Sequence, residues 1–371
     1  MTPTEILAAW HEAAVAAAPI DLEVWDAHSH TGEHDPDGFV LDDDALLGAL
    51  GAAGHAGAVV TSNANPGGYV EANDRILAEA EASAGRLVPF CRVDPKDDGA
   101  VAELQRSLDK GHRGIKLHPR AEAFAMADAG VAGVAAVAAE RGVPILVHAG
   151  RGIPAMGPAT VALLEANHGL NIVLAHCGIS DLSGLGPIAA EVPGLYFDTS
   201  WWDVTDRLAL HGWVPPHRIV YASDTPYGWP DLSFVMTLRA ARTSGYGERQ
   251  LRGLFGGSLL ALLDGSTPPD LGPAAGTNRI VADPGLIRAH ASTHGALTSV
   301  FAHADMTEPL SLARLACDVP PGTPHEAVFR AIKATLDAVD EAQDRRMEVA
   351  LLITASGAAL TPEVDLPDLS G

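Results

Sequence analysis

The stretch RGIKLHPRAEAFAMADAGVAGVAAVAAERGVPILVHAGRGIPAMGPATVALLEANHGLNIVLAH, residues 113–176, contains the pattern that decides the fold. Within it, three short apolar runs, at 113–118, 143–148 and 171–176, each end in a histidine. Ala- and Leu-rich segments of helical character separate these runs. Such alternation indicates βαβ units, in which helices connect parallel strands.

The same alternation continues on both sides of this stretch. Further apolar runs bounded by Gly, Pro or Asp lie at 20–28, 57–62, 86–93, 194–200 and 217–224. Eight strand–helix units over about 245 residues are typical of a closed barrel. An open doubly wound sheet is the alternative, but it usually has fewer strands and a Gly-rich first turn, which is missing here. We therefore predict an α/β protein, a (β/α)8 TIM barrel with a C-terminal helical extension.

The composition changes after the eighth predicted strand. We expect a barrel domain over 1–264, a Pro/Gly-rich connector over 265–278 (GSTPPDLGPAAGTN) and a helical C-terminal extension over 279–371. The clearest helix of the extension is TPHEAVFRAIKATLDAVDEAQDR, residues 323–345, for which Thr323 and Glu326 predict a capping-box start. One face of this helix carries an apolar stripe that needs a partner, made of Val328, Ile332, Leu336 and Val339.

Charge and composition exclude several classes of function. The formal net charge is −23 and no run is rich in Lys or Arg, which argues against a nucleic-acid partner and against an anionic membrane surface. Three scattered cysteines argue against a disulfide framework. The N-terminus is Ala-rich but lacks the features of a signal peptide, and no stretch is long and apolar enough to span a membrane. We expect a cytoplasmic protein.

Metal-ligand side chains stand at the ends of the predicted strands. In a (β/α)8 barrel, polar residues at the carboxyl ends of the strands face the active site. Residues two apart on a strand point the same way, so the His-x-His at the end of the first strand can converge on one ion. The candidates, in chain order, are His28, His30, Lys116, His118, His148, His176 and Asp224.

This order, His-x-His, Lys, His, His, Asp, resembles the amidohydrolase superfamily. The segments RGIKLHP, ILVHAG, LAHCG and YASDTPYG, with ANDRIL and VPFCRVDP before them, resemble its amidohydrolase-2 branch, which includes the aminocarboxymuconate-semialdehyde decarboxylase group. The resemblance covers residues 20–264 and leaves 279–371 outside. It implies that the metal is bound by His28, His30, His148 and Asp224, and that Asp224 and His176 are catalytic.

Neutral imidazoles and a carboxylate suit a divalent ion such as zinc, with one position open for water or substrate. Asp224 could then serve as general base, and His176 could shuttle a proton. Two arrangements stay open. If Lys116 is carboxylated it bridges two ions, the second held by His148 and His176; if it stays a cation it faces the substrate. The branch that the chain resembles more often uses one ion, so we expect one.

Other side chains are candidates for substrate contacts. Arg151 follows His148 closely enough to reach a substrate carboxylate, although a solvated loop arginine is the alternative. His118 either lines the site or packs, and aromatic residues after the seventh and eighth strands either form the pocket wall or pack under the extension: Trp201, Trp202, Tyr227 and Trp229. Asp26 fits a supporting role next to the ligands.

The leading prediction is a hydrolase that acts on an amide, lactone or ester of a small molecule. The alternative is a non-oxidative decarboxylase of a small carboxylic acid, which would use the same metal ligands. An inert barrel that serves as a scaffold is a third reading, and no missing ligand favours it. The expected partner is a small-molecule substrate, and the sequence is compatible with a homo-oligomer.

Overall fold

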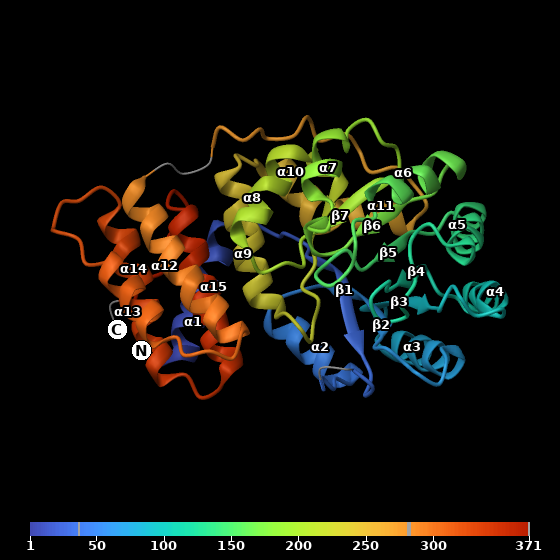
Figure 1. The fold of residues 1–371 in the computed structure, drawn as a ribbon, viewed down its shortest axis with the longest axis horizontal. Helices are drawn as coiled ribbons and strands as arrows, with labels where there is room; N and C mark the ends of the chain where they lie inside the picture. The colour runs from blue at the N-terminus through green and yellow to red at the C-terminus, as the bar shows by residue number, and fades with distance from the viewer. Residues whose placement is uncertain (36–37, 280–282, 370–371) are drawn as a thin grey trace.

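The computed structural model describes residues 1–35, 38–279 and 283–369. Its strands form one parallel sheet in the order of the chain, from β1 to β8, and helices surround it (Figure 1). The predicted TIM barrel is confirmed. The strands are β1 (Trp25–Thr31), β2 (Gly57–Ser62), β3 (Leu87–Arg92), β4 (Gly114–Leu117), β5 (Ile145–Val147), β6 (Ile172–Leu174), β7 (Leu195–Asp198) and β8 (Ile219–Val220).

The barrel closes between β1 and the residues that follow β8. The Ala27 amide donates to the Tyr221 carbonyl at 2.9 Å, and the His30 amide donates to the Thr225 carbonyl at 2.7 Å. In the opposite direction, the Asp224 amide donates to the His28 carbonyl at 2.9 Å. These bonds hold Asp224 beside the two histidines of β1.

The alternation of side chains along the strands separates two apolar layers. In β4, Ile115 and Leu117 pack in the layer between the sheet and the helices, so the residue between them, Lys116, points into the barrel. In β5, Leu146 faces the interior, and His148 follows two residues later with the same orientation. The barrel geometry therefore aims both polar side chains inward.

The first strand lies later in the chain than predicted, at 25–31 instead of 20–28. A turn precedes it, in which the Leu22 amide donates to the Pro19 carbonyl at 3.2 Å and Asp21 has a φ of 55°. Both histidines of the His-x-His therefore lie inside the strand. The eighth strand is also shorter than predicted: residues 216–218 form a 3-10 turn before it, and it ends at Val220.

Helix α1 precedes the first strand and the other helices before the extension follow the strands, with η denoting short 3-10 or π turns. They are α1 (Pro3–Ala17), α2 (Asp43–Ala52), α3 (Val70–Ala82), α4 (Ala100–Lys110), α5 (Ala129–Arg141), α6 (Gly157–Ala166), η1 (His176–Gly178), α7 (Leu182–Leu185), η2 (Gly186–Ile188), α8 (Val204–Trp213), η3 (Pro216–Arg218), α9 (Pro230–Thr243), α10 (Glu248–Arg252), η4 (Gly253–Gly257) and α11 (Ser258–Leu263). Within the described ranges, no helix is long and apolar enough to cross a membrane.

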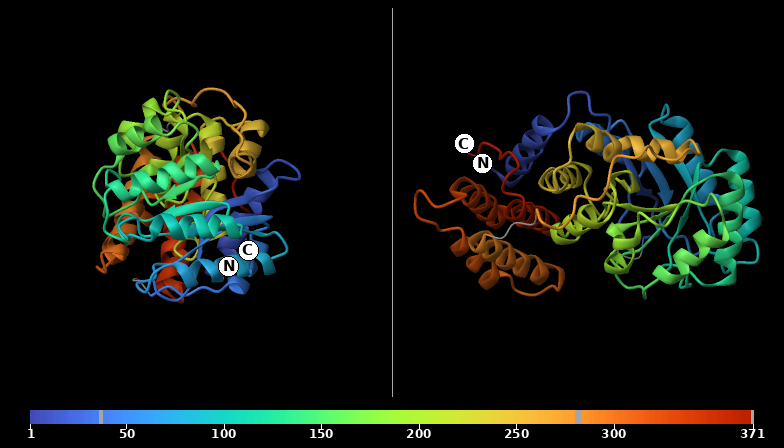
Figure 2. Two further views of the ribbon diagram at one scale, coloured as in Figure 1. Left: turned by 90° about the vertical axis from the view of Figure 1, so that its right-hand side faces the viewer. Right: turned by 90° about the horizontal axis from the view of Figure 1, so that it is seen from above.

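The C-terminal helices form a second lobe beside the barrel, and both chain termini lie on this lobe (Figures 1 and 2). One apolar cluster joins the two lobes. It contains Ile6 and Trp10 of α1 and Met236 and Ala240 of α9 together with the buried residues of the extension. The helices of the extension are α12 (Pro284–Phe301), α13 (Thr307–Ala316), α14 (Glu326–Asp337), η5 (Ala338–Glu341) and α15 (Arg345–Leu360).

The predicted capping box of the extension is wrong. Helix α14 begins at Glu326 after His325, which has a φ of 60° and forms no side-chain cap. The Thr323 hydroxyl donates to the Pro320 carbonyl at 2.7 Å instead, and Glu326 accepts from the Gly322 amide at 2.7 Å. A tight turn before the helix therefore uses the groups that would have formed the cap. The apolar stripe is buried in the cluster that joins the lobes: Val328, Ile332, Leu336 and Val339.

Candidate active site

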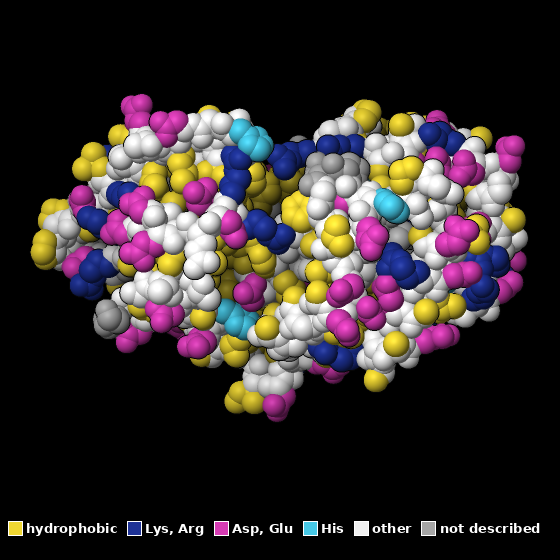
Figure 3. Space-filling model, turned by 90° about the horizontal axis from the view of Figure 1, so that it is seen from below, with side chains coloured by type: hydrophobic (Ala, Val, Ile, Leu, Met, Phe, Trp, Pro, Cys, Tyr) yellow, Lys and Arg dark blue, Asp and Glu magenta, His cyan; other side chains and the backbone are white. Residues whose placement is uncertain are grey.

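A cavity of about 970 Å³ opens at the carboxyl ends of the barrel strands, where the barrel meets the extension. The molecule is hollowed between its two lobes, and Lys and Arg side chains gather there (Figure 3). All seven of the candidates at the strand ends line this cavity, and so do the candidates for substrate contacts, Arg151, Trp201, Trp202, Tyr227 and Trp229. The structure therefore brings the sequence-predicted residues into one space.

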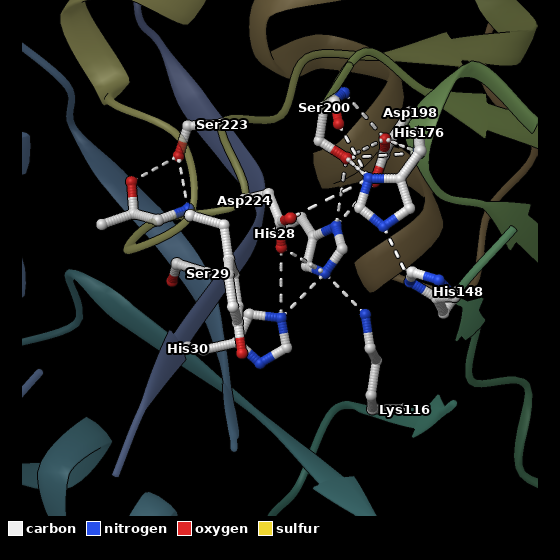
Figure 4. Close-up of polar contacts among 12 residues, drawn as sticks. His28, Ser29, His30, Lys116, His148, His176, Asp198, Ser200, Ser223 and Asp224 are labelled. Carbon is white, nitrogen blue, oxygen red and sulfur yellow. Dashed lines mark hydrogen bonds and ion pairs between the residues drawn. The ribbon is translucent and has the colours of Figure 1, made fainter. Parts of the chain in front are cut away.

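Three of the predicted ligands form a compact group at the base of the cavity (Figure 4). The Nε2 atoms of His28 and His30 are 3.0 Å apart, and Asp224 Oδ1 lies 3.2 Å from the first and 3.3 Å from the second. The side chain of Asp224 is 15% exposed, against 1% for His28 and 4% for His30. A substrate in the cavity therefore reaches the group past Asp224.

The hydrogen bonds around this group suit a divalent cation. His28 Nδ1 lies 2.9 Å from Asp198 Oδ2, and His30 Nδ1 lies 3.5 Å from the Ser62 carbonyl, so both Nδ1 atoms have acceptors for their protons. Burial lowers the pKa of both histidines, which favours neutral rings. Two Nε2 lone pairs and a carboxylate oxygen then meet at one point, a donor set that suits a divalent cation and that Lys116 Nζ also approaches.

Asp198, at the end of β7, supports His28 and was not identified from the sequence. Its Oδ1 accepts from the His176 amide at 2.8 Å, the Ser200 amide at 2.9 Å and the Ser200 hydroxyl at 2.6 Å, while Oδ2 faces His28. Burial raises the pKa of the Asp198 carboxyl, and these donors oppose that effect. A carboxylate that fixes the tautomer of a metal-binding histidine raises its basicity. The signal was available, because Asp198 also stands at a strand end.

His148 and His176 lie beside the group but contact each other. His176 Nδ1 is 2.8 Å from the Ser200 carbonyl, so its Nε2 is left as the acceptor for His148 Nδ1 at 2.9 Å. His118 stacks on His148 with ring centroids 4.0 Å apart. The buried Nε2 of His148 has no hydrogen-bond partner among the described residues. Burial also lowers the pKa of His148, so this atom offers a lone pair to the cavity.

Lys116 reaches the same group from β4. It is fully buried, and its Nζ lies 2.5 Å from His28 Nε2. Burial lowers the pKa of the Lys116 ammonium to about 8. The structure thus places a basic nitrogen directly against a ligand of the predicted metal.

The backbone around the site adopts uncommon conformations. Asp224 has a φ of 61° and His176 a φ of 59°, and such left-handed conformations cost non-glycine residues about 1 kcal/mol or more. The Asp26 carboxylate helps to hold the Asp224 turn, because its Oδ1 accepts from the His28 amide at 3.0 Å and from the Ser223 amide at 2.9 Å. Burial raises the pKa of Asp26 to about 7. Asp26 therefore joins β1 to the residues after β8, as expected for a supporting residue.

The aromatic candidates divide between the cavity and the packing of the extension. Tyr227 contacts the edge of His30 with centroids 5.6 Å apart and donates its hydroxyl proton to Asp35. Trp202 lines the cavity but also packs on Phe301 at 5.1 Å, a residue of the extension. Five lining arginines were missed: Arg92, Arg120, Arg207, Arg345 and Arg346. No pattern in the sequence places residues of the extension at the mouth of a barrel.

Comparisons with solved structures give the same fold. A 2,6-dihydroxybenzoate decarboxylase from Rhizobium is 16% identical, with 65% of this chain and 98% of that chain covered and a TM-score of 0.52. The 5-carboxyvanillate decarboxylase LigW from Sphingomonas paucimobilis is 13% identical, with 66% of this chain and 99% of that chain covered and a TM-score of 0.52. The 4-oxalomesaconate hydratase LigJ from Rhodopseudomonas palustris is 15% identical, with 65% of this chain and 96% of that chain covered and a TM-score of 0.51. These structures are covered almost entirely, whereas about a third of this chain has no counterpart in them.

No curated protein matches the chain significantly. A family model described as Amidohydrolase, of the amidohydrolase-2 type, matches residues 25–257, which include every strand of the barrel and all four predicted metal ligands. The matched segment is more than half of the 371 residues. The chain belongs to the amidohydrolase-2 family.

Proposed function

We propose that this protein is a metal-dependent enzyme that acts on a small carboxylated substrate, and that its reaction is a non-oxidative decarboxylation. The observation that carries the proposal is the charge of the cavity. Among the lining residues, Lys and Arg outnumber Asp by seven to two, although the whole chain has a formal net charge of −23. A cationic cavity in an acidic protein favours an anionic ligand.

Five of the lining arginines form no ion pair with an acidic residue in the described part of the chain: Arg120, Arg151, Arg207, Arg345 and Arg346. An arginine that is held near other cations without a counterion is available to a carboxylate, which its planar guanidinium binds through paired hydrogen bonds. Guanidinium groups of this kind favour carboxylated substrates over neutral ones. The decarboxylases among the similar folds act on aromatic carboxylates by name, which supports the same reaction class here.

In this proposal His28, His30 and Asp224 would hold the ion, while the fourth predicted ligand, His148, contacts His176 and lies outside their group. The bound ion would supply Lewis acidity to a substrate oxygen. The bond between the substrate carbon and its carboxylate breaks, the electron pair stays on that carbon, and CO₂ leaves. Asp224 or His176 then delivers a proton to the carbon. His176 would first have to gain a proton at Nε2, because that atom accepts from His148 Nδ1 at 2.9 Å while its Nδ1 is held by the Ser200 carbonyl at 2.8 Å.

Hydrolysis of an ester, lactone or amide is the second candidate, and one observation favours it. Asp224 Oδ2 lies 3.9 Å from His176 Nδ1, and Asp224 is the exposed member of the ligand group. A carboxylate in this position could take a proton from water and pass it to a leaving group. The metal ligands are the same for both reactions, so the product distinguishes them.

We propose to test the two reactions with a panel of hydroxylated benzoates and unsaturated diacids, together with lactones and esters that carry a carboxylate. Decarboxylation is expected to release one CO₂ per turnover and to incorporate one solvent deuteron on carbon. Hydrolysis would instead incorporate ¹⁸O from labelled water. The control is His28→Ala, which should be inactive in both assays. Turnover of neutral esters with no preference for carboxylated substrates would overturn the proposal.

The number of ions is a separate prediction, and we expect one zinc ion per chain. A second ion next to the first needs an anionic bridge, because two cations a few ångströms apart repel each other. An unmodified Lys116 supplies no anion, and it lies 2.5 Å from His28 Nε2. Metal analysis of protein loaded in bicarbonate buffer is expected to give about one equivalent both in the wild type and in Lys116→Ala. Two equivalents that fall to one in Lys116→Ala would show a carboxylated, bridging lysine.

We also propose a cytoplasmic enzyme without a nucleic-acid partner or an affinity for anionic membranes. The cysteines Cys91, Cys177 and Cys317 are free and buried, which suits a reducing compartment. The net charge of −23 would repel phosphate backbones and anionic lipids.

A further inference from the structure

We propose that the C-terminal extension forms the far end of the active site and selects substrates that carry a second anionic group. In this arrangement Arg151, Arg345 and Arg346 bind that group at a distance from the ligand group of His28, His30 and Asp224. The inference rests on the proposed function for the first carboxylate, which lies at the metal end of the cavity. The second anion can be a carboxylate or a phosphate, since guanidinium groups bind both through the same paired hydrogen bonds.

The extension contributes directly to the cavity. Val300 and Phe301 at the end of α12 and His303 just after it line the cavity together with Arg345 and Arg346 at the start of α15. The hollow between the lobes in Figure 3 is this boundary. The family model ends at residue 257, so this part of the wall lies outside what the family shares.

Two guanidinium groups from different lobes meet at the segment 300–303. Arg345 of the extension donates to the Val300 carbonyl and to His303 Nδ1. Arg151 of the barrel stacks over the Phe301 ring at 5.6 Å and over the Trp201 ring at 5.7 Å. Carbonyl and aromatic contacts fix both arginines, and neither pairs with an acidic residue within the described ranges.

Arg346 is held on the barrel in a similar way. Its guanidinium donates to the Pro226 carbonyl at 2.8 Å and lies 4.8 Å from the Trp229 ring and 5.2 Å from the Phe39 ring. Arg345 and Arg346 are the first two residues of α15, whose N-terminal end already carries partial positive charge. The Asp344 carboxylate caps this helix end by accepting from the Met347 amide at 2.9 Å, so the two arginines stand beside a capped helix terminus.

The wall of the cavity that the extension forms is held in place by the packing of α15 and the residues after it against α9. Met236 of α9 lies against α15 so closely that a Cβ on Gly357 would be 2.4 Å from its Cε. Arg239 of α9 donates to the Thr361 hydroxyl at 2.9 Å and to the Asp365 carbonyl at 2.9 Å. The span between the metal end and the arginines is therefore set by the docking of the two lobes. A wall at a set distance selects for the length of the substrate as well as for its charge.

The test is calorimetric titration of the purified, metal-containing protein with matched pairs of acids. Straight-chain diacids from succinate to suberate are each compared with the monoacid of equal carbon number. We expect at least one diacid to bind about tenfold or more tightly than its monoacid. Replacing one carboxylate of that diacid by a phosphonate tells which anion the arginines prefer, and tighter binding of either one supports the proposal.

Variants then assign this preference to the arginines. Arg345→Gln and Arg151→Gln are expected to reduce the diacid preference about tenfold, because the diacid should lose more affinity than the monoacid, and Arg345→Lys should retain part of the preference. Arg330→Gln, which removes an exposed arginine elsewhere on the extension, is the matched control. Thermal melting shows whether each variant is folded, and Arg151 lies on a separate loop in case Arg345→Gln is not. A wild type without diacid preference, or the same preference in both glutamine variants, would overturn the inference.

One further variant separates this inference from the proposed function. His28→Ala should weaken the binding of monoacids and diacids alike if the first carboxylate lies at the metal. If both bind normally to His28→Ala, the proposed function fails, whereas the dependence of the diacid preference on Arg345 still decides the role of the extension.

Discussion

His28→Ala and Asp224→Ala are each expected to lose most of the bound metal and to lower turnover by about 10³-fold or more. His28, His30 and Asp224 place three donor atoms within 4.8 Å of one another, and a site with so few donors cannot lose one without losing affinity. Metal analysis after gel filtration in chelator-free buffer gives the ion content, and the assay for CO₂ release gives turnover.

Removing the carboxylate that supports His28 should have a smaller effect than removing a ligand. Asp198→Asn should leave every ligand in place but weaken metal affinity by about 10- to 100-fold, because the amide no longer raises the basicity of His28. His168→Ala, at an exposed position after α6, is the matched control and should keep its metal. Full metal content together with normal turnover in His28→Ala or Asp224→Ala would contradict the assignment of the ligands.

The barrel could be predicted because its signals are local. Each strand is a short apolar run that ends in a polar residue, and the alternation along β4 and β5 follows from strand geometry. The boundaries were less accurate, as β1 shows, since the turn at 19–22 depends on a single residue with positive φ. Runs of apolar residues indicate that a strand exists better than they indicate where it begins.

The three members of the ligand group and the supporting role of Asp26 were predicted from the sequence, whereas the contact of Asp198 with His28 was not. The sequence offers Asp26, Asp198 and Asp224 as similar acidic residues at strand ends, and only the three-dimensional arrangement gives each a different partner. The arginines of the extension could not be placed at all. Arg345 and Arg346 follow the last strand by more than a hundred residues, and their position depends on how two lobes pack.

The barrel contributes several buried apolar side chains to its contact with the C-terminal extension. Val204 and Leu208 of α8 and Met236 and Ala240 of α9 are between 0% and 6% exposed, and all belong to the apolar cluster shared with the extension. Burial of a large apolar side chain contributes about 1.5–3 kcal/mol, and a domain has a total free energy of unfolding of about 5–15 kcal/mol. Exposing several such side chains at once therefore costs an amount comparable to the whole stability of the barrel.

A chain truncated after Gly265 is accordingly expected to aggregate, or to melt at a temperature lower by roughly 10 °C or more. Truncation would also leave the Arg239 guanidinium without its acceptors on Thr361 and Asp365. The matched control is a full-length chain cut at a protease site inserted after the exposed Ser266 and left unseparated. Because the lobes share one apolar cluster, the cut chain should stay associated and keep its melting temperature in size-exclusion and calorimetric measurements. A truncated protein that remains monodisperse, with unchanged melting and turnover, would show that the barrel does not need the extension for its stability.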